Sequence, residues 1–303
     1  MELSKLAKQV KRGNRLALSK GITIVENDRK DAARLLSELE TPGRAFVLGI
    51  TGPPGTGKSS LVDRLIGTYR GKGLKVGVIA VDPTSPITGG ALLGDRVRMV
   101  SHSDDEAVFI RSMASRGWSG GLSRAASQAI QLMDAAGFDV ILLETVGIGQ
   151  ADIDVVGVSH AVLVVLMPGL GDDVQVSKAG LMEVGDVYVV NKSDLEGADL
   201  MVVSLLGLVR GLKSRSPAVV KVSALTGDGL DRLDTAVESI RSKFVQGDPE
   251  LRLRSLRSMI IETARGNAME RLGRIPNATV EKLAREVLAG KFTVDQAAAR
   301  IGG

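Results

Sequence analysis

The feature that most constrains this chain is the glycine-rich segment 52–59, which lies between an apolar run and a helix-forming run. It reads Gly-Pro-Pro-Gly-Thr-Gly-Lys-Ser, after residues 46–50 and before residues 61–69. Glycines let the backbone wrap closely around an anion, and the N-terminus of the following helix adds partial positive charge. This G-x4-G-K-S pattern, in a strand–loop–helix setting, predicts a P-loop that binds a nucleoside triphosphate.

Two side chains of this segment have distinct expected roles. Lys58 can reach the β- and γ-phosphates, and the hydroxyl of Ser59 can ligate Mg2+. The residues expected to surround the phosphates are Gly52, Pro53, Pro54, Gly55, Thr56, Gly57, Lys58, Ser59 and Ser60.

A second motif, Asn-Lys-Ser-Asp at 191–194, predicts which base is bound. The carboxylate of Asp194 can accept hydrogen bonds from guanine N1–H and the exocyclic amine, whereas adenine carries an acceptor at N1 and no amine at C2. Asn191 can donate to N7 and tie the loop down, and the aliphatic stem of Lys192 can cover the base face. The motif therefore favours guanine over adenine.

A third segment contributes to the same prediction. Ser223, Ala224 and Leu225 follow the apolar run 218–222. A backbone N–H of this segment can meet guanine O6. The four-residue motif at 191–194 is weak evidence for guanine binding by itself. Its position after a P-loop and before this segment makes that evidence strong.

Carboxylates at strand ends are the candidate Mg2+ ligands. Asp82 follows the run 76–81, Glu144 follows the run 140–143, and Asp95 lies in a Gly-rich stretch. Mg2+ keeps several waters and takes few protein ligands, so such carboxylates near Ser59 fit the role. For Asp82, a helix cap or a salt bridge is a nearly equal alternative.

The expected machinery for hydrolysis departs from that of Ras-like proteins. Gly147 is placed to sense the γ-phosphate, but Ile148 follows it, where Ras-like proteins carry the Gln that orients water. Gln150 lies two residues further on. We therefore expect slow intrinsic hydrolysis that a partner accelerates. The candidate catalytic residues are Lys58, Asp95, Glu144 and Gln150.

The apolar runs predict an α/β fold. Val/Ile/Leu-rich runs separated by helix-sized intervals indicate strands of a mainly parallel sheet that is buried on both faces. These runs are 45–50, 75–81, 107–111, 139–143, 161–167, 186–190 and 218–222. Changes in the pattern of apolar and polar residues along the chain predict three parts. They are an N-terminal helical extension over 1–42, a P-loop domain over 43–246 and a C-terminal helical arm over 247–303.

Composition excludes several classes of function. The chain has no cysteine, which excludes disulfides, Cys-ligated zinc and iron–sulfur clusters. Aromatic residues make up 3% and the formal net charge is +4, which argues against a nucleic-acid partner. The longest apolar runs are far shorter than the ~20 residues that cross a bilayer. We expect a cytoplasmic protein with neither a nucleic-acid nor a membrane partner.

Taken together, these motifs resemble the MeaB/ArgK/MMAA family, the GTPases that accompany methylmalonyl-CoA mutase. The distinctive stretches are 81–96, with Val-Asp-Pro-Thr-Ser-Pro and later Gly-Asp-Arg, and 168–178, which begins Pro-Gly-Leu-Gly-Asp-Asp-Val-Gln. Ile-Thr-Ile-Val-Glu-Asn at 22–27 and Glu-Thr-Val-Gly-Ile-Gly-Gln at 144–150 also match. The likeness therefore covers nearly the whole chain.

The resemblance implies several further properties. It implies the fold of the signal-recognition and metallochaperone (SIMIBI) GTPases, Mg2+ near Asp82, Asp95 and Glu144, and a switch loop over 168–178 that faces the mutase. It implies a homodimer formed through the C-terminal arm. The implied function is hydrolysis of GTP to GDP and phosphate that gates loading and protection of adenosylcobalamin on methylmalonyl-CoA mutase or a related acyl-CoA mutase, with cobalamin adenosyltransferase as a further partner.

Two other functions share the same motifs. A metal-insertion GTPase, for example for nickel, has the same loops, but such proteins generally display His and Cys ligands, and this chain has two His and no Cys. A non-enzymatic scaffold with a structural nucleotide site would release no phosphate from GTP. An older interpretation of the family, a kinase linked to arginine or ornithine transport, finds no second catalytic constellation in this sequence.

Overall fold

The computed structural model describes residues 3–27, 29–39, 43–82, 102, 104–114, 121–145, 157–169, 181–211 and 217–302. Within this part of the chain, seven strands form one sheet in the order β3-β2-β4-β1-β5-β6-β7, and every neighbouring pair is parallel. The strands are β1 Phe46–Thr51, β2 Val76–Asp82, β3 Val108–Ala114, β4 Val140–Glu144, β5 Ala161–Leu166, β6 Val187–Val190 and β7 Ala218–Lys221. The predicted α/β class with a mostly parallel sheet is confirmed.

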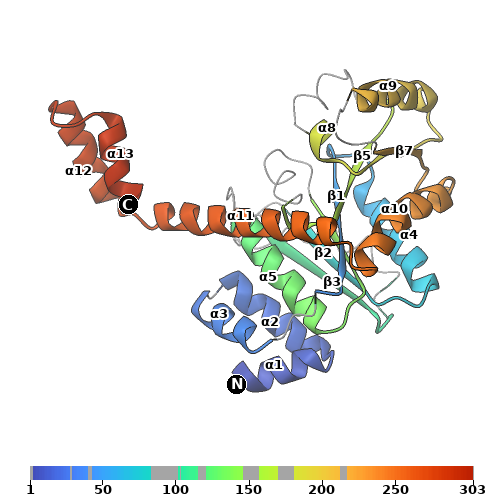
Figure 1. Cartoon of the computed structure of the whole chain (residues 1–303), viewed down its shortest axis with the longest axis horizontal. Coiled ribbons are helices and arrows are strands. Elements are labelled where there is room, and N and C mark those ends of the chain that lie inside the picture. The colour runs from blue at the N-terminus through green and yellow to red at the C-terminus, as the bar shows by residue number, and fades with distance from the viewer. Residues whose placement is uncertain are drawn as a thin grey trace.

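Helices cover both faces of this sheet (Figure 1). They are α1 Leu3–Lys11, α2 Arg15–Asn27, α3 Arg29–Ser37, α4 Lys58–Gly71, α5 Gly121–Ala135, α8 Leu181–Val184, α9 Ala198–Arg210, α10 Leu230–Val245, α11 Pro249–Gly273, α12 Asn277–Leu288 and α13 Val294–Gly302. Every residue of β1, β4, β5 and β6 is buried. Burial on both faces explains why these strands are continuous apolar runs without polar alternation.

Strand β3 is longer than its apolar run predicts. The sequence indicates 107–111, whereas the strand continues to Ala114, which pairs with Asp82 of β2. β3 is the edge strand beyond β2, and its end includes Ser112. Its extra length comes from backbone pairing along β2, which an apolar pattern does not report.

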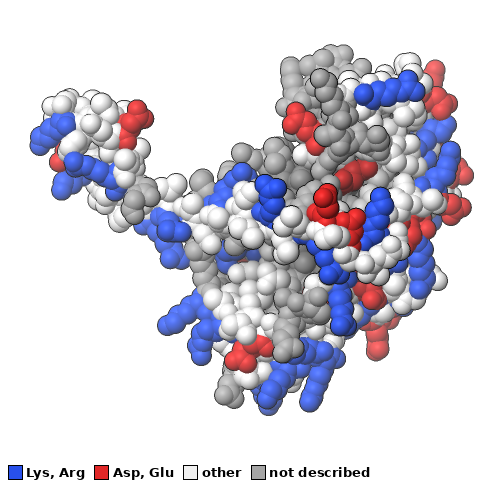
Figure 2. Space-filling model, viewed as in Figure 1, with Lys and Arg blue, Asp and Glu red and all other residues white. Residues whose placement is uncertain are grey.

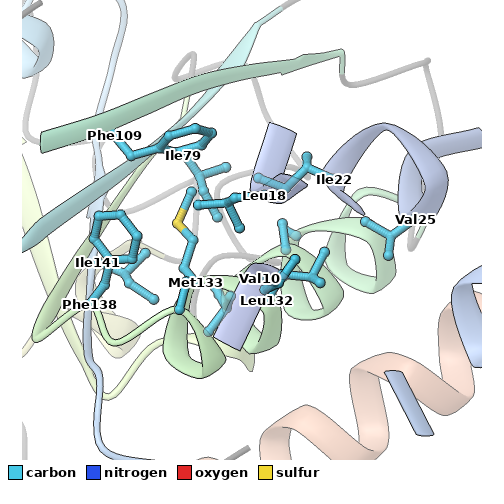
Figure 3. Packing of buried hydrophobic residues seen from close by; sticks show 14 of the residues in the cluster. Val10, Leu18, Ile22, Val25, Ile79, Phe109, Leu132, Met133, Phe138 and Ile141 are labelled. Carbon is cyan, nitrogen blue, oxygen red and sulfur yellow. The ribbon is translucent and has the colours of Figure 1, made fainter. Parts of the chain in front are cut away.

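The N-terminal helices complete one of the hydrophobic layers. Leu18, Ile22 and Val25 of α2 belong to one buried cluster with residues of α5 and with Ile79 and Ile141 of the sheet (Figure 3). Val10 and Leu132 belong to the same cluster.

The two faces of the sheet carry separate hydrophobic clusters, because successive side chains of a strand point to opposite faces. In β1, Val47 faces the cluster beneath the N-terminal helices and α5. Its neighbours Phe46 and Leu48 face the cluster beneath α4 and α10.

The outer side of the same N-terminal helices is charged. Lys5, Lys8, Lys11 and Arg12 are exposed, and basic side chains gather around these helices in Figure 2. The helices are therefore amphipathic, with the apolar side in the core and the basic side in solvent.

The C-terminal helices extend from the sheet domain (Figure 1). Helix α11 begins after Gly247, which has φ +86°, and the carboxylate of Asp248 accepts hydrogen bonds from the N–H groups of Glu250 and Leu251 at 2.9 and 3.2 Å. The helix passes α5 and carries α12 and α13 away from the sheet. The domain boundaries at 42 and 246 stay predictions. Among the described residues, no helix has the length and apolar character that a membrane-crossing segment requires.

Replacing Leu18 by alanine is expected to lower the free energy of unfolding by about 2–5 kcal/mol, because the change removes buried apolar atoms and leaves a cavity. Leu18 is 1% exposed and Leu16, on the same helix, is 75% exposed. Leu16→Ala is thus the matched control, expected to change stability by less than about 0.5 kcal/mol. Urea denaturation measures both variants. Equal losses would show that the N-terminal helices do not belong to the cooperative core.

Candidate functional site

The candidate site lies at the carboxyl ends of the central strands, where the connection from β1 to α4 forms the glycine-rich loop. Residues 52–57 form this connection, and Lys58, Ser59 and Ser60 begin α4. The nine predicted phosphate-binding residues therefore form one continuous segment, which consists of the loop and the first turn of α4. In an open parallel sheet, ligands bind outside the carboxyl ends of the strands.

Two glycines of this loop are fixed by their surroundings. Gly52 has φ +139°, and a Cβ there would lie 2.0 Å from the carbonyl oxygen of Val165 in β5. Gly57 has φ +85°, and a Cβ there would lie 2.5 Å from Nδ2 of Asn191. The loop must therefore pack its bare backbone against β5 on one side and against the 191–194 loop on the other.

Lys58 is held by carbonyl groups of the loop itself. Its Nζ donates hydrogen bonds to the carbonyl oxygens of Gly52 and Pro53 at 2.8 and 3.0 Å, and the side chain is buried. The hydroxyl of Thr56 also donates to the carbonyl oxygen of Pro53 at 2.9 Å. The ammonium group thus lies beside the loop whose amides are expected to bind phosphate.

The first turn of α4 is joined to the end of β4. The hydroxyl of Ser59 donates a 2.6 Å hydrogen bond to Oε1 of Glu144, and both residues are buried. The register brings them together, because Glu144 pairs with Ile50 just before the loop begins. A hydroxyl and a carboxylate in contact supply the oxygen ligands that Mg2+ prefers.

Asp82 ends the neighbouring strand at the same edge of the sheet. Ala80 of β2 pairs with Glu144, so the backbone of Asp82 lies two residues further along the strand. The side chain of Asp82, all of Asp95, Gly147 and Gln150, and most of the segment 168–178 lie outside the described residues.

Asn191 joins the phosphate loop to the 223–225 segment. Its Nδ2 donates to the carbonyl oxygens of Thr56 at 2.8 Å and Gly57 at 3.4 Å, and its Oδ1 accepts from the N–H of Ala224 at 3.0 Å. The residue is 1% exposed. These contacts tie the phosphate loop to the 223–225 segment, as predicted for Asn191, and its contact to guanine N7 stays a prediction.

Asp194 and Ser223 meet at the outer end of the same arrangement. The hydroxyl of Ser223 donates to Oδ1 of Asp194 at 2.6 Å, and the N–H of Ser193 donates to the carbonyl oxygen of Val222 at 3.0 Å. Lys192 adopts φ +54°, an uncommon left-handed conformation that turns the chain back toward β7. The hydrogen bond from Ser223, followed by one from the backbone N–H of Asp194, lowers the pKa of the Asp194 carboxyl.

One contact of the site has no counterpart in the motifs. Arg64 of α4 donates from Nε to the carbonyl oxygen of Ala224 at 2.8 Å and from Nη2 to that of Leu225 at 2.7 Å. Arg64 and the segment are 160 residues apart in the chain. No local sequence signal distinguishes this arginine from the other exposed cations of helices.

The family model and two relatives that this chain matches are all described as GTPases. Residues 18–271 match the family model described as "Methylmalonyl Co-A mutase-associated GTPase MeaB". A Pyrococcus horikoshii protein named as a GTPase is 48% identical over 256 residues, which are 82% of this chain and 80% of that protein. GTPase ArgK of Escherichia coli K12 is 37% identical, over 78% of this chain and 75% of its own.

Among solved structures, the fold is similar to that of a protein titled LAO/AO transport system kinase. The TM-score is 0.74, and the match covers 99% of this chain and 96% of the other, at 23% identity. At this level of identity the likeness concerns the fold alone. Sheet, helical layers and extensions thus belong to one known architecture.

Replacing Ser223 by alanine is expected to raise the pKa of Asp194 toward its usual value, because the hydrogen bond that lowers it is removed. The carboxylate of the wild type stays ionised as pH falls below the usual Asp range and is protonated only at the lowered pKa. A carboxyl-carbon NMR titration from about pH 6 to pH 2 measures both values. Ser239→Ala is the control, since the Ser239 hydroxyl donates to the carbonyl oxygen of Ala236. An unchanged Asp194 titration in Ser223→Ala would contradict the assigned cause.

Proposed function

The chain belongs to the family of methylmalonyl-CoA mutase-associated GTPases, and from this premise we propose that it gates the adenosylcobalamin of a mutase through Mg2+-dependent GTP hydrolysis. The relatives named as GTPases identify it as a GTP hydrolase that forms GDP and phosphate. The client is methylmalonyl-CoA mutase or a related B12-dependent acyl-CoA mutase. Cobalamin adenosyltransferase is a further proposed partner.

The observation that carries the guanine assignment is the set of contacts made by Asn191. One carboxamide contacts both the phosphate loop, at Thr56, and the segment at Ala224. Because Ser223 also binds Asp194, the predicted acceptor for guanine lies in the same connected group. This connectivity supports a single nucleotide site in which the phosphates meet one end of the group and the base meets the other.

The residues at the phosphate end have separate proposed tasks. Amide groups of the glycine-rich loop and the ammonium of Lys58 bind the β- and γ-phosphates and stabilise charge that develops during hydrolysis. Water attacks the γ-phosphorus, the bond to the β,γ-bridging oxygen breaks, and GDP and phosphate leave. Gly147 is proposed to sense the γ-phosphate, and Asp95 and Gln150 complete the proposed catalytic set.

The buried Ser59–Glu144 contact fits a Mg2+ site. Both groups offer oxygen atoms at the edge of the sheet that carries the phosphate loop, and Asp82 ends the adjacent strand there. Ser59, Asp82, Asp95 and Glu144 are the proposed ligands, through water where direct contact is not made. When bound, Mg2+ would neutralise charge on the β- and γ-phosphate oxygens.

The proposed base contacts follow from hydrogen-bond chemistry. The Asp194 carboxylate accepts from N1–H and the 2-amino group of guanine, a backbone N–H of the 223–225 segment meets O6, and the stem of Lys192 covers the ring. The Asp194 carboxyl is ionised at neutral pH, as the proposed acceptor role requires, and the hydrogen bond from Ser223 orients one of its oxygens.

The C-terminal helices support a proposed homodimer. Large apolar side chains are exposed on α11 and α12, among them Leu253, Leu256, Ile260, Leu272 and Leu288. Such side chains are typical of a face that another protein covers. A cytoplasmic location stays a prediction from the sequence.

The metal-insertion alternative has less support. The matching family model describes mutase-associated GTPases, and the chain offers two histidines and no cysteine as soft or borderline ligands. No observation on the described residues favours it.

The proposed function is tested by measuring phosphate release from GTP by the full chain, alone and with purified methylmalonyl-CoA mutase. Turnover is expected to be slow alone and to rise at least about tenfold with the mutase, as when a partner supplies or repositions a catalytic group. Lys58→Ala should abolish both rates while retaining the fold, monitored by thermal unfolding.

The outcomes separate the possible functions. Fast turnover without a partner would contradict the proposed gating. Phosphate release that the mutase leaves unchanged would remove the mutase from the proposal. No release under any condition would favour the structural scaffold.

A further inference from the structure

We propose that Arg64 is a positioning residue for guanine recognition, which orients the peptide groups of the 223–226 turn toward the O6 atom of the base. The inference rests on the proposed function, because it concerns how the same nucleotide site distinguishes bases. No motif of the chain includes Arg64.

The guanidinium group holds two successive carbonyl groups at once. Nε and Nη2 donate to the carbonyl oxygens of Ala224 and Leu225 at 2.8 and 2.7 Å. The planar fork of arginine suits such a paired contact, whereas the single ammonium of lysine does not. Arg64 lies on α4, the helix that starts at Lys58, so the helix at the phosphates also holds the turn at the base.

Peptide planarity converts this contact into an orientation of N–H groups. In a trans peptide the C=O and N–H groups point in opposite directions. The Leu225 carbonyl faces Arg64, and the N–H of Thr226 in the same peptide donates to Oγ of Ser223 at 3.3 Å. Ser223 in turn binds Asp194, so the side of the turn opposite Arg64 is the side of the proposed base acceptor.

The peptide group that joins Ala224 to Leu225 is oriented in the same way. The Ala224 carbonyl faces Arg64, so the N–H of Leu225 points away from the guanidinium. The N–H of Ala224 is bound to Oδ1 of Asn191. We infer that the N–H of Leu225 is held in place by Arg64 to donate to guanine O6.

The side chain of Leu225 contributes little to this orientation, whereas that of Ala224 is buried in the hydrophobic core. Leu225 is 78% exposed, so its side chain does not fix the turn against the core. Ser223 is instead bound to Asp194, a contact in which Arg64 takes no part. Loss of Arg64 should therefore weaken the O6 contact and leave the Asp194 contact to N1–H and the 2-amino group unchanged.

Two modified nucleotides separate these contacts. In 6-thio-GDP a sulfur atom, a weaker acceptor, replaces O6, while inosine diphosphate keeps O6 and lacks the 2-amino group. In Arg64→Met, GDP affinity should fall about threefold to tenfold, the effect of roughly one net hydrogen bond. The preference for GDP over 6-thio-GDP should shrink by the same factor, and the preference for GDP over inosine diphosphate should not change. Titration calorimetry with Mg2+ measures these three affinities, and that for ADP, on the full chain.

Arg70→Met is the matched control on the same helix. Arg70 donates to Oδ2 of Asp105 and to the carbonyl oxygen of Leu74, each at 2.7 Å, at the end of α4 away from the base segment. It should change neither preference. Arg64→Lys is a second variant, which keeps the charge and should retain part of the 6-thio-GDP preference.

The possible results are distinct. Arg64 variants that bind all three nucleotides more weakly by one factor, or that keep the 6-thio-GDP preference of the wild type, would overturn the inference while GTP binding stands. A wild type that does not prefer GDP to ADP would overturn both the inference and the proposed function.

Discussion

The arrangement of the whole site depends on one buried carboxamide. Asn191 donates to Thr56 of the phosphate loop and accepts from Ala224 of the segment after β7. The carboxamide supplies a donor and an acceptor from one short side chain, and an ionised aspartate in its place could not donate to the loop carbonyl. Because Asn191 is 1% exposed, loss of either partner would leave a buried polar group unsatisfied.

The parallel sheet makes this bridge possible. β1, β6 and β7 all end at the same edge, so loops far apart in the chain meet there. Helical layers on both faces fix the strands, and one of these layers includes the N-terminal helices together with α5. Residues near the N-terminus and in the middle of the chain thus stabilise the scaffold that holds the loops. The proposed coupling between nucleotide and partner would act through the carboxylates at the strand ends, which lie at the edge of this scaffold.

Much of the fold could be predicted from the sequence, because strands buried on both faces must be continuous apolar runs, as β1, β4 and β5 are. The loop at 52–59 could be predicted equally well, since two of its glycines, Gly52 and Gly57, are required by close contacts with Val165 and Asn191. The end of β3 could not be predicted, because the length of this edge strand is set by backbone pairing with β2. The contact of Arg64 could not be predicted for another reason. Its two acceptors are backbone carbonyls about 160 residues away, and a backbone carbonyl is present in every residue type. The left-handed Lys192 likewise has no signature in its residue type.

The central claim is that one connected set of loops binds a guanine nucleotide with Mg2+. Titration calorimetry of the full chain with non-hydrolysable analogues of GTP and ATP, each with Mg2+ and with a chelator, tests it most directly. We expect the GTP analogue to bind in a Mg2+-dependent manner and more than about tenfold more tightly than the ATP analogue, since adenine has no donor at N1 or C2 for Asp194. Equal or tighter binding of the ATP analogue, or uptake that the chelator leaves unchanged, would contradict the account.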